Sequence, residues 1–318
     1  MADTQLAQRP TAPPSNLRPR FSWLTDRWLA VSFITPTLAI LLFISIFPLV
    51  WSLYLSFTDW SVIRDAAVDP STQWVGTANY VDLLTDRRTW ERFIVTGQFV
   101  VPAVTLELLI GFGVAMLLNR RFTGRGLIMT LMLVPMMLSP VVVALFWRFM
   151  MQGEGVLNYY VVNLLQQPPV LWLTDRNIVI WSLVLVDVWM WTPFMMLMSL
   201  AGLSAVPRYL YEAAAVDRAG AWFRFRHITL PMVTPLLLIA IIFRTMDAYK
   251  LFDQAFVLLG NRGGPGRAGQ TAALWVYEEA FTNWNTGSAS ALGYIMLIVI
   301  IALANLFIRA LNATKGAE

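Results

Sequence analysis

Six ionisable residues lie in or beside segments that are otherwise apolar: Glu107, Asp187, Arg244, Asp247, Lys250 and Asp253. A charge inside a bilayer is costly, so each residue is a candidate for binding a substrate or a coupling ion. The last four are spaced by three residues, which on a helix also allows neighbouring charges to form ion pairs. We expect such a pair between Lys250 and Asp253. Arg244 needs a partner or a watery cavity, because it lies about 13 residues, or roughly 20 Å of helix, beyond Pro231.

Other kinds of chemistry are excluded by residue type. The chain has no cysteine and one histidine, His227, which excludes disulfides, thiol nucleophiles, Cys-ligated zinc and almost all His-based metal sites or catalytic triads. The segment Gly264 to Thr271 has the spacing of a phosphate-binding loop, but Gln270 replaces the lysine that reaches the phosphates. We therefore predict no enzymatic activity, no metal and no nucleotide site in this chain.

The six ionisable residues must be positioned by segments that lie in the hydrocarbon core of a membrane. Of the 318 residues, 58% are hydrophobic and 13% are charged, whereas soluble domains are about 45–50% apolar. One stretch, 228–243, is apolar until Arg244 interrupts it, and five others can each span a bilayer as a helix. The five are Trp28 to Thr58, Phe93 to Asn119, Gly126 to Trp147, Asn177 to Pro207 and Ala280 to Ile308. We predict an all-α polytopic membrane protein with six transmembrane helices in residues 28–310.

The distribution of lysine and arginine predicts the orientation, because basic residues concentrate in cytoplasmic loops. With the N-terminus inside, the second and fourth loops also lie inside and carry clusters of arginine (Arg120, Arg121, Arg125, Arg208, Arg218, Arg224 and Arg226). We expect residues 1–27 to form a flexible cytoplasmic tail and residues 311–318 to form a cytoplasmic C-terminal tail. The net charge of +4 reflects this topology, so nucleic-acid binding is not expected.

The fourth loop, residues 207–231, has more internal order than a connector needs. Pro207 suits the first turn of a helix, the alanines around residue 214 favour a helix, and Gly220 suits its end. Beyond Gly220 an apolar stripe at helical spacing reaches Pro231, where the fifth span is expected to begin. An alanine-rich helix lets another backbone approach closely, and an acidic residue beside it can pair with an arginine of a partner. We therefore predict a docking contact here.

This loop resembles the EAA loop of ABC-importer permease subunits, more narrowly the carbohydrate-uptake permeases of the maltose and glycerol-3-phosphate type. The matching positions are Glu212, Ala213, Ala214, Asp217, Gly220, Leu230 and Pro231. Residues 247–253, 263–266 and 287–291 are also similar to this family, so that the resemblance covers about residues 28–310. Arg218 departs from the pattern, since many members have glycine after the aspartate.

The resemblance implies a type I ABC importer permease fold with a cytoplasmic EAA coupling helix, in the bacterial inner membrane. It implies a second homologous permease subunit, two cytoplasmic ATPase subunits that bind ATP and magnesium, and an extracytoplasmic substrate-binding protein. The permease itself would need no cofactor. On this interpretation Glu212 pairs with a basic residue of an ATPase, Ala213 and Ala214 permit the close fit, and the external loop around residues 260–285 contacts the binding protein.

The resemblance also implies a substrate cavity between the spans on either side of the loop. The matching positions are Trp191, Thr192, Phe194, Arg244 and Asp247. Aromatic faces stack on sugar rings while a few fixed polar groups bind hydroxyls, so we expect a sugar or a sugar derivative. Two roles remain open for Arg244, which could clamp an anionic substrate or pair with Asp247.

A transporter of another class is the alternative hypothesis. A proton- or sodium-coupled carrier could use Glu107 and Asp187 as relay carboxylates. That hypothesis offers no explanation for the segment 207–231, and the sequence shows no convincing internal repeat of the kind found in many such carriers. Dependence of uptake on ATP, with no sensitivity to collapse of the proton gradient, would distinguish the two.

Overall fold

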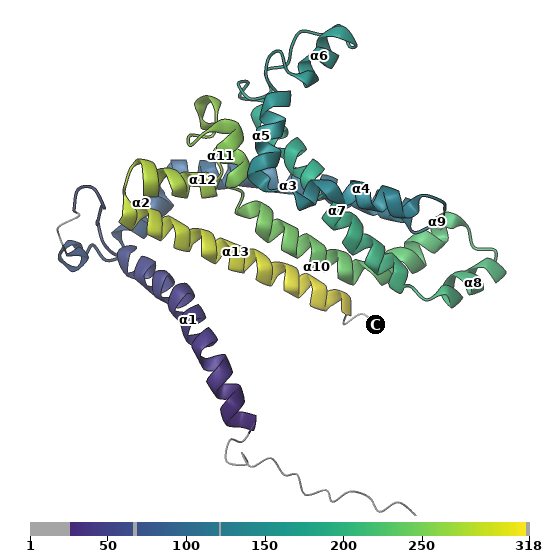
Figure 1. Cartoon of the computed structure of the whole chain (residues 1–318), viewed down its shortest axis with the longest axis horizontal. Helices are drawn as coiled ribbons and strands as arrows, with labels where there is room; N and C mark the ends of the chain where they lie inside the picture. The colour runs from purple at the N-terminus through teal and green to yellow at the C-terminus, as the bar shows by residue number, and fades with distance from the viewer. Residues whose placement is uncertain (1–25, 66–68, 121, 316–318) are drawn as a thin grey trace, which may run out of the picture. The chain divides into compact units, whose positions relative to one another are not determined.

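The computed structural model describes residues 26–65, 69–120 and 122–315, and its regular elements there are all helical (Figure 1). The α-helices are α1 (Asp26–Leu55), α2 (Ala78–Thr85), α3 (Arg87–Leu118), α4 (Arg125–Met137), α5 (Pro140–Met150), α6 (Val156–Asn163), α7 (Val179–Ala205), α8 (Arg208–Val216), α9 (Ala221–Arg224), α10 (Leu230–Tyr249), α11 (Asp253–Leu259), α12 (Ala272–Tyr277) and α13 (Thr286–Lys315). Short turns of 3₁₀-helix, η1 (Pro70–Gln73) and η3 (Pro265–Arg267), and of π-helix, η2 (Phe225–Thr229) and η4 (Glu278–Thr282), complete the list. The expected tails at residues 1–25 and 316–318 lie outside the described residues.

The chain divides into two units at Ser52. The first contains most of α1, whose apolar side chains are exposed along the helix; Phe33 and Phe43, for example, are 78% and 67% exposed. Such a surface is stable only in lipid or against another apolar partner. The second unit, residues 53–318, contains all the other helices and the functional residues.

Five stretches of helix are long and apolar enough to cross a membrane: Val31–Leu55, Arg87–Leu118, Val179–Ala205, Ala221–Tyr249 and Thr286–Arg309. The pair α4 and α5 passes the same test and gives six spans when it is counted as one. The all-α membrane fold predicted from the sequence is thereby confirmed. Three of the predicted spans nevertheless differ from the expectation, one in form and two in where they begin.

The predicted third span, Gly126 to Trp147, is broken into α4 and α5, which meet at 95°. Leu138 and Ser139 between them have extended backbone. The break follows from Pro140, because proline disfavours helical backbone at the residue before it and suits the first turn of a new helix. Hydrophobicity alone gave no indication of this bend.

The fifth span begins ten residues earlier than expected, at Ala221 instead of Pro231. The turn before Pro231 widens into the π-helical η2, in which Leu230 N–H donates to the Phe225 carbonyl five residues back. Proline cannot donate the next backbone hydrogen bond, and a π-turn is one way for a helix to accommodate that loss. The predicted second short helix of the loop is therefore continuous with the span.

The crossing of α3 and α7 forms the centre of the second unit, and α10 packs against both helices and against α13. Gly111 allows the close approach, since a Cβ atom there would lie 2.7 Å from Cβ of Met195 and 2.8 Å from the backbone nitrogen of Met196. Glu107 lies one turn before Gly111 on the same face of α3. The crossing thus brings Glu107 into the interface between the helices.

The last span begins at Thr286, six residues later than the predicted Ala280. Residues 278–282 instead form η4, which precedes a short loop. Gly287 then packs so closely on the segment after α1 that a Cβ atom would lie 2.0 Å from the Thr58 carbonyl oxygen. The start of α13 is therefore fixed by a contact that only glycine permits.

Candidate functional site

Arg244 is the centre of a group of four charged side chains from three helices, which we call the charge cluster: Arg244 and Asp247 of α10, Glu107 of α3 and Asp187 of α7. The guanidinium donates from Nε to Glu107 Oε2 at 2.7 Å and from Nη2 to Glu107 Oε1 at 2.8 Å. Nη2 also donates to Asp187 Oδ2 at 2.6 Å, and Nη1 donates to Asp247 Oδ2 at 2.7 Å. Four of the five N–H groups of an arginine are thus engaged by three carboxylates.

Burial of the charge cluster is uneven. The side chains of Glu107, Asp187 and Arg244 are 0%, 1% and 2% exposed, whereas that of Asp247 is 53% exposed. The indole of Trp191 covers the guanidinium, whose Cζ lies 4.8 Å from the ring centroid, a geometry favourable for a cation–π contact. Three members therefore stabilise one another inside the helix bundle, and Asp247 faces outward.

A cavity of about 360 Å³ lies beside the charge cluster. It is lined by Trp191, Phe194 and Met198 of α7 and by Phe243, Arg244 and Asp247 of α10. Its size lies within the range of small-molecule sites, about 300–1,000 Å³. Four of the five positions that the resemblance implies for substrate contact therefore line one surface.

Thr192, the fifth of those positions, lies elsewhere. It is buried, its hydroxyl donates to the Val188 carbonyl of its own helix at 2.6 Å, and it lines a different, largely apolar cavity with Trp147 and Trp189. Successive residues of a helix point about 100° apart, so Thr192 cannot share the face of Trp191. Thr192 is not part of the cavity described above.

The expected ion pair between Lys250 and Asp253 is not formed within the described residues, and that prediction was wrong. Helix α10 ends at Tyr249 and α11 begins at Asp253. The two residues therefore do not occupy neighbouring positions of one helix, which the prediction required.

The predicted coupling segment contains the short helix α8, which ends at a residue other than the one expected. Gly220 has φ −63°, whereas Arg218 has φ +53° and takes the left-handed position. Ala219 N–H donates to the Ala214 carbonyl and Arg218 N–H donates to that of Ala215, the hydrogen bonds of a Schellman motif. Arg218 thus occupies the position at which glycine is favoured, and Gly220 begins the next helix.

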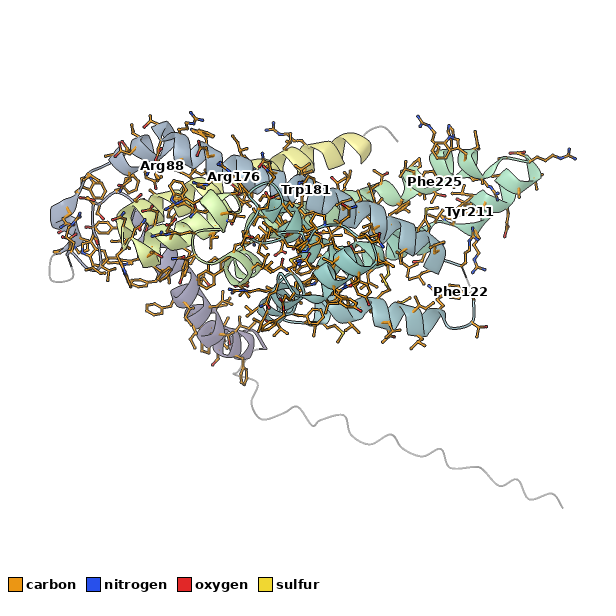
Figure 2. All side chains as sticks on the ribbon, turned by 90° about the horizontal axis from the view of Figure 1, so that it is seen from above. Arg88, Phe122, Arg176, Trp181, Tyr211 and Phe225 are labelled. Carbon is orange, nitrogen blue, oxygen red and sulfur yellow. The ribbon has the colours of Figure 1, made fainter. Side chains whose placement is uncertain are left out.

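The side chains of α8 are largely exposed. Glu212, Ala213 and Asp217 are exposed and Ala214 is 7% exposed; the Glu212 carboxylate makes no hydrogen bond or ion pair with any described residue. The helix is anchored by Tyr211, whose hydroxyl lies 2.9 Å from the Thr229 hydroxyl. Figure 2 places Tyr211 at the same end of the second unit as Phe122 of the second loop.

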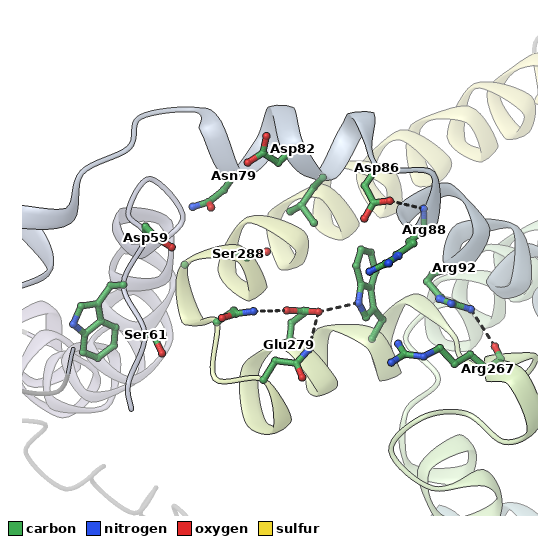
Figure 3. A pocket seen from close by; sticks show the side chains of 16 residues that line it. Asp59, Ser61, Asn79, Asp82, Asp86, Arg88, Arg92, Arg267, Glu279 and Ser288 are labelled. Atoms are coloured by element: carbon green, nitrogen blue, oxygen red, sulfur yellow. Dashed lines mark hydrogen bonds between the residues drawn. The ribbon is translucent and has the colours of Figure 1, made fainter. Parts of the chain in front are cut away.

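The opposite end of the second unit carries a polar pocket of about 390 Å³ that sequence analysis missed (Figure 3). Its lining includes the charged residues Asp59, Asp82, Asp86, Arg88, Arg92, Arg267 and Glu279 together with Trp275. These residues come from distant segments of the sequence; Asp59 and Glu279, for example, are more than 200 positions apart. No local motif joins them, so no sequence pattern could have identified the pocket.

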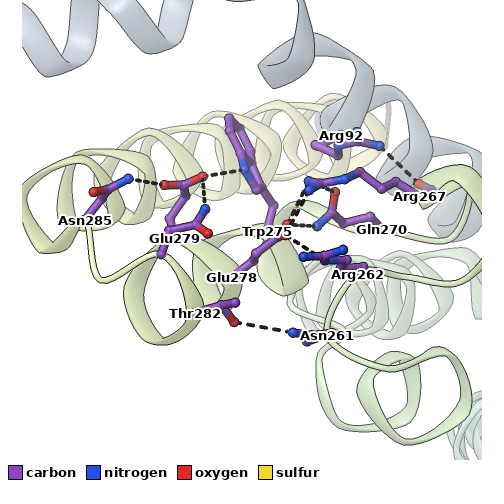
Figure 4. A network of polar contacts seen from close by, with 11 residues as sticks. Arg92, Asn261, Arg262, Arg267, Gln270, Trp275, Glu278, Glu279, Thr282 and Asn285 are labelled. Atoms are coloured by element: carbon purple, nitrogen blue, oxygen red, sulfur yellow. Dashed lines mark hydrogen bonds and ion pairs between the residues drawn. The ribbon is translucent and has the colours of Figure 1, made fainter.

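A polar network fixes the wall of this pocket (Figure 4). Arg267 binds Glu278 through both terminal nitrogens, at 2.8 and 3.0 Å, and the Glu278 carboxylate is 2% exposed. Glu279 accepts from the Trp275 indole and from the amides of Asn283 and Asn285. Its oxygens are already bound, so the pocket wall is preformed.

Comparison with known proteins connects this geometry to a family. Residues 107–315 match the model of the family "Binding-protein-dependent transport system inner membrane component". The chain belongs to this family. The match includes α8, Asp187 and the whole of α10, and it begins at Glu107.

Relatives support the same assignment over a greater length. The permease is 38% identical to the probable ABC transporter permease protein y4oQ of Sinorhizobium fredii, over 86% of this chain and 87% of that protein. It is 34% identical to the trehalose/maltose transport system permease protein MalF of Thermococcus litoralis, over 88% and 92% of the two chains. It is 32% identical to the sulfoquinovosyl glycerol transport system permease protein SmoG of Agrobacterium fabrum, over 92% and 94%.

The fold is also that of a solved importer subunit. A chain of a bacterial ABC transporter involved in the import of the acidic polysaccharide alginate superposes with a TM-score of 0.78 at 18% identity, over 91% of this chain and 97% of that one. The permease is thus a multi-pass inner membrane subunit of an ABC importer, and such permease subunits are not themselves enzymes. Neither the comparisons nor the charge cluster favours a secondary transporter, since Glu107 and Asp187 are both bound to Arg244.

Proposed function

We propose that this permease forms one half of the translocation pore of an ATP-driven importer for a carbohydrate or carbohydrate derivative. The observation that carries the proposal is the cavity between α7 and α10, which combines the aromatic faces of Trp191 and Phe194 with the exposed carboxylate of Asp247. An aromatic face stacks on the C–H face of a sugar ring, and a fixed carboxylate accepts hydrogen bonds from its hydroxyls. Relatives named for trehalose and maltose transport support the same substrate class.

The partners follow from the same proposal. A second, homologous permease completes the pore, and two cytoplasmic ATPase subunits bind ATP and magnesium, while this chain needs no cofactor. Helix α8 docks on one ATPase, with Glu212 pairing with a basic residue and Ala213 allowing close approach. Ala214, which is 7% exposed beside it, contributes to the same close fit, and Asp217, Gly220, Leu230 and Pro231 complete the proposed coupling segment. Both termini then lie in the cytoplasm.

The opposite end of the permease is proposed to receive an extracytoplasmic substrate-binding protein. The polar pocket and the loop around residues 260–285 supply both acidic and basic side chains there. A structurally similar alginate transporter, with a TM-score of 0.74 at 19% identity, was solved in complex with alginate pentasaccharide-bound periplasmic protein. That complex supports a comparable arrangement for this permease.

Transport by the reconstituted importer tests the substrate cavity. The permease is assembled in proteoliposomes with a partner permease, an ATPase and a binding protein, and uptake of radiolabelled saccharides is measured with and without internal ATP. We expect ATP-dependent uptake that Trp191→Ala reduces at least about tenfold, since one lost stacking contact of about 1.4 kcal/mol has that effect. Trp181→Ala is the matched control, because Trp181 lies on the same helix but is 58% exposed and outside the cavity. Equal loss in both variants would contradict the proposal.

A further inference from the structure

Arg244, the basic residue of the substrate cavity, is not accessible to a substrate. Although Arg244 lines the cavity, its side chain is 2% exposed, and it donates to Glu107, Asp187 and Asp247. The Trp191 ring covers the guanidinium. A phosphate, sulfonate or carboxylate on a substrate would compete with these carboxylates for Arg244, and displacing Glu107 or Asp187 would leave a buried carboxylate without a partner.

The charge that the cavity does present is negative. The Asp247 side chain is 53% exposed, and only its Oδ2 accepts from Arg244, which leaves Oδ1 free of hydrogen bonds within the described residues. Behind it, the Arg244 guanidinium is shared with Glu107 and Asp187, which are buried and do not line the cavity. The rest of the lining is aromatic or apolar: Trp191, Phe194, Met198 and Phe243.

We infer that this cavity selects uncharged saccharides and discriminates against acidic ones, with Asp247 as the residue that repels them. This inference rests on the proposed function, because it concerns the same cavity. Hydroxyl donors of a neutral sugar satisfy Asp247 Oδ1, whereas an anionic group meets like charge with no free cation to compensate. The relatives of this permease include one named for trehalose and maltose and one named for sulfoquinovosyl glycerol. The names of these relatives therefore include both uncharged sugars and a sulfonated one.

Lys250 follows the last residue of α10 and lies three residues beyond Asp247 in the sequence. It does not line the cavity, and it forms no ion pair with Asp247 within the part of the chain described. Among the residues that the structure describes, Asp247 pairs with Arg244 alone, and Arg244 also pairs with Glu107 and Asp187.

The test compares neutral sugars with their acidic counterparts in the complete importer. Trehalose, maltose and cellobiose are each paired with the uronate in which one hydroxymethyl group is oxidised to a carboxylate. The uptake ratio of uronate to parent sugar is measured for wild type, Asp247→Asn and Asp253→Asn. Because the binding protein and the partner permease are identical in all three, any change in ratio arises from this chain.

The two variants are chosen to isolate the charge of Asp247. The side-chain amide introduced by Asp247→Asn keeps an oxygen that can accept from Arg244. Asp253 is the control, because it lies outside the cavity at the start of α11.

We expect wild type to favour the neutral sugar and Asp247→Asn to raise the ratio at least about tenfold, as a like-charge repulsion of about 1.4 kcal/mol requires. Asp253→Asn should leave the ratio unchanged. An unchanged ratio in Asp247→Asn, or preference of wild type for the uronates, would overturn the inference while leaving the permease a carbohydrate importer. Uptake of none of the six compounds by any variant would overturn the proposed function itself, and the inference with it.

Discussion

The charge cluster and helix α8 are both built from charged residues that the sequence singled out, yet their surroundings are opposite. In the charge cluster, each charged group has a partner within 2.6–2.8 Å, and three of the four side chains are at most 2% exposed. On α8, Glu212 and Asp217 are exposed, and Glu212 forms no ion pair in the described part of the chain.

The difference indicates where each region finds its partners. The charge cluster joins α3, α7 and α10 and is complete within the chain, so a change there should first affect folding. Helix α8 is held by few contacts and presents its acidic and alanine positions outward, so a change there should leave the fold intact and affect assembly. Measurements of stability and of transport on the same variants separate the two.

Arg244→Leu should have the largest effect on stability. It leaves Glu107 and Asp187 buried without a cation, and removing one member of a buried ion pair costs about 3–5 kcal/mol. We expect loss of monodisperse protein in detergent and a lower unfolding temperature, measured by size-exclusion chromatography after heating. Adding Glu107→Gln and Asp187→Asn to this variant should recover much of the loss. Wild-type stability of Arg244→Leu alone would show that the cluster does not hold the helices.

Gly111→Val tests the helix crossing that brings the cluster together. The new side chain would overlap Met195 and Met196, and overpacking of this kind costs about 1–3 kcal/mol. Gly113→Val is the matched control two residues away, where an added Cβ has no atom within 4 Å. The same thermal assay should show a lower unfolding temperature for Gly111→Val only; similar values for both variants would argue against a close crossing.

Glu212→Lys should leave stability unchanged and abolish transport, the opposite of the expectation for the helix crossing. An exposed side chain without an internal partner can be replaced at a cost within about 0.5 kcal/mol, so the unfolding temperature should stay unchanged. ATP-driven uptake and co-purification of the ATPase should both be lost, because the substitution reverses the charge at the proposed contact. Glu154→Lys, on an exposed loop between α5 and α6, is the control. Normal uptake by Glu212→Lys would place the docking contact elsewhere.

Arg218→Gly should have the smallest effect. Arg218 holds a left-handed conformation, with φ +53°, that glycine adopts without strain. We expect a gain of about 0.5–1 kcal/mol in stability with uptake preserved. A loss of stability, measured by the same heating assay, would indicate that the arginine side chain supports the end of α8.

The sequence predicted the features that depend on composition along one segment. Long uncharged stretches identified the spans, and the residues around Glu212 identified α8. It did not predict features that depend on contacts between distant segments. Glu107 lies 137 residues from Arg244, and nothing in either segment shows that the two meet, so Glu107 was assigned to proton transfer in the alternative hypothesis.

Local backbone effects account for the other differences. The bend at Ser139 and the π-turn before Pro231 both arise from prolines inside apolar segments. A hydrophobic stretch with a proline can bend, break or continue through a wider turn, and hydrophobicity does not distinguish these outcomes. The departure of Arg218 from the family pattern was visible in the sequence, but the left-handed backbone conformation of this residue was not.

The most direct test of the central claim, that α8 is a cytoplasmic contact for an ATPase, is labelling of Ala213→Cys. Since the chain has no native cysteine, a membrane-impermeant maleimide reports on this position alone, and Glu154→Cys, in the exposed loop expected on the external side, serves as the control. We expect Ala213→Cys to react in inside-out vesicles stripped of ATPase, to be protected when the ATPase is bound, and to be unreactive in intact cells. Reaction in intact cells, or equal reaction with the ATPase bound, would contradict the account.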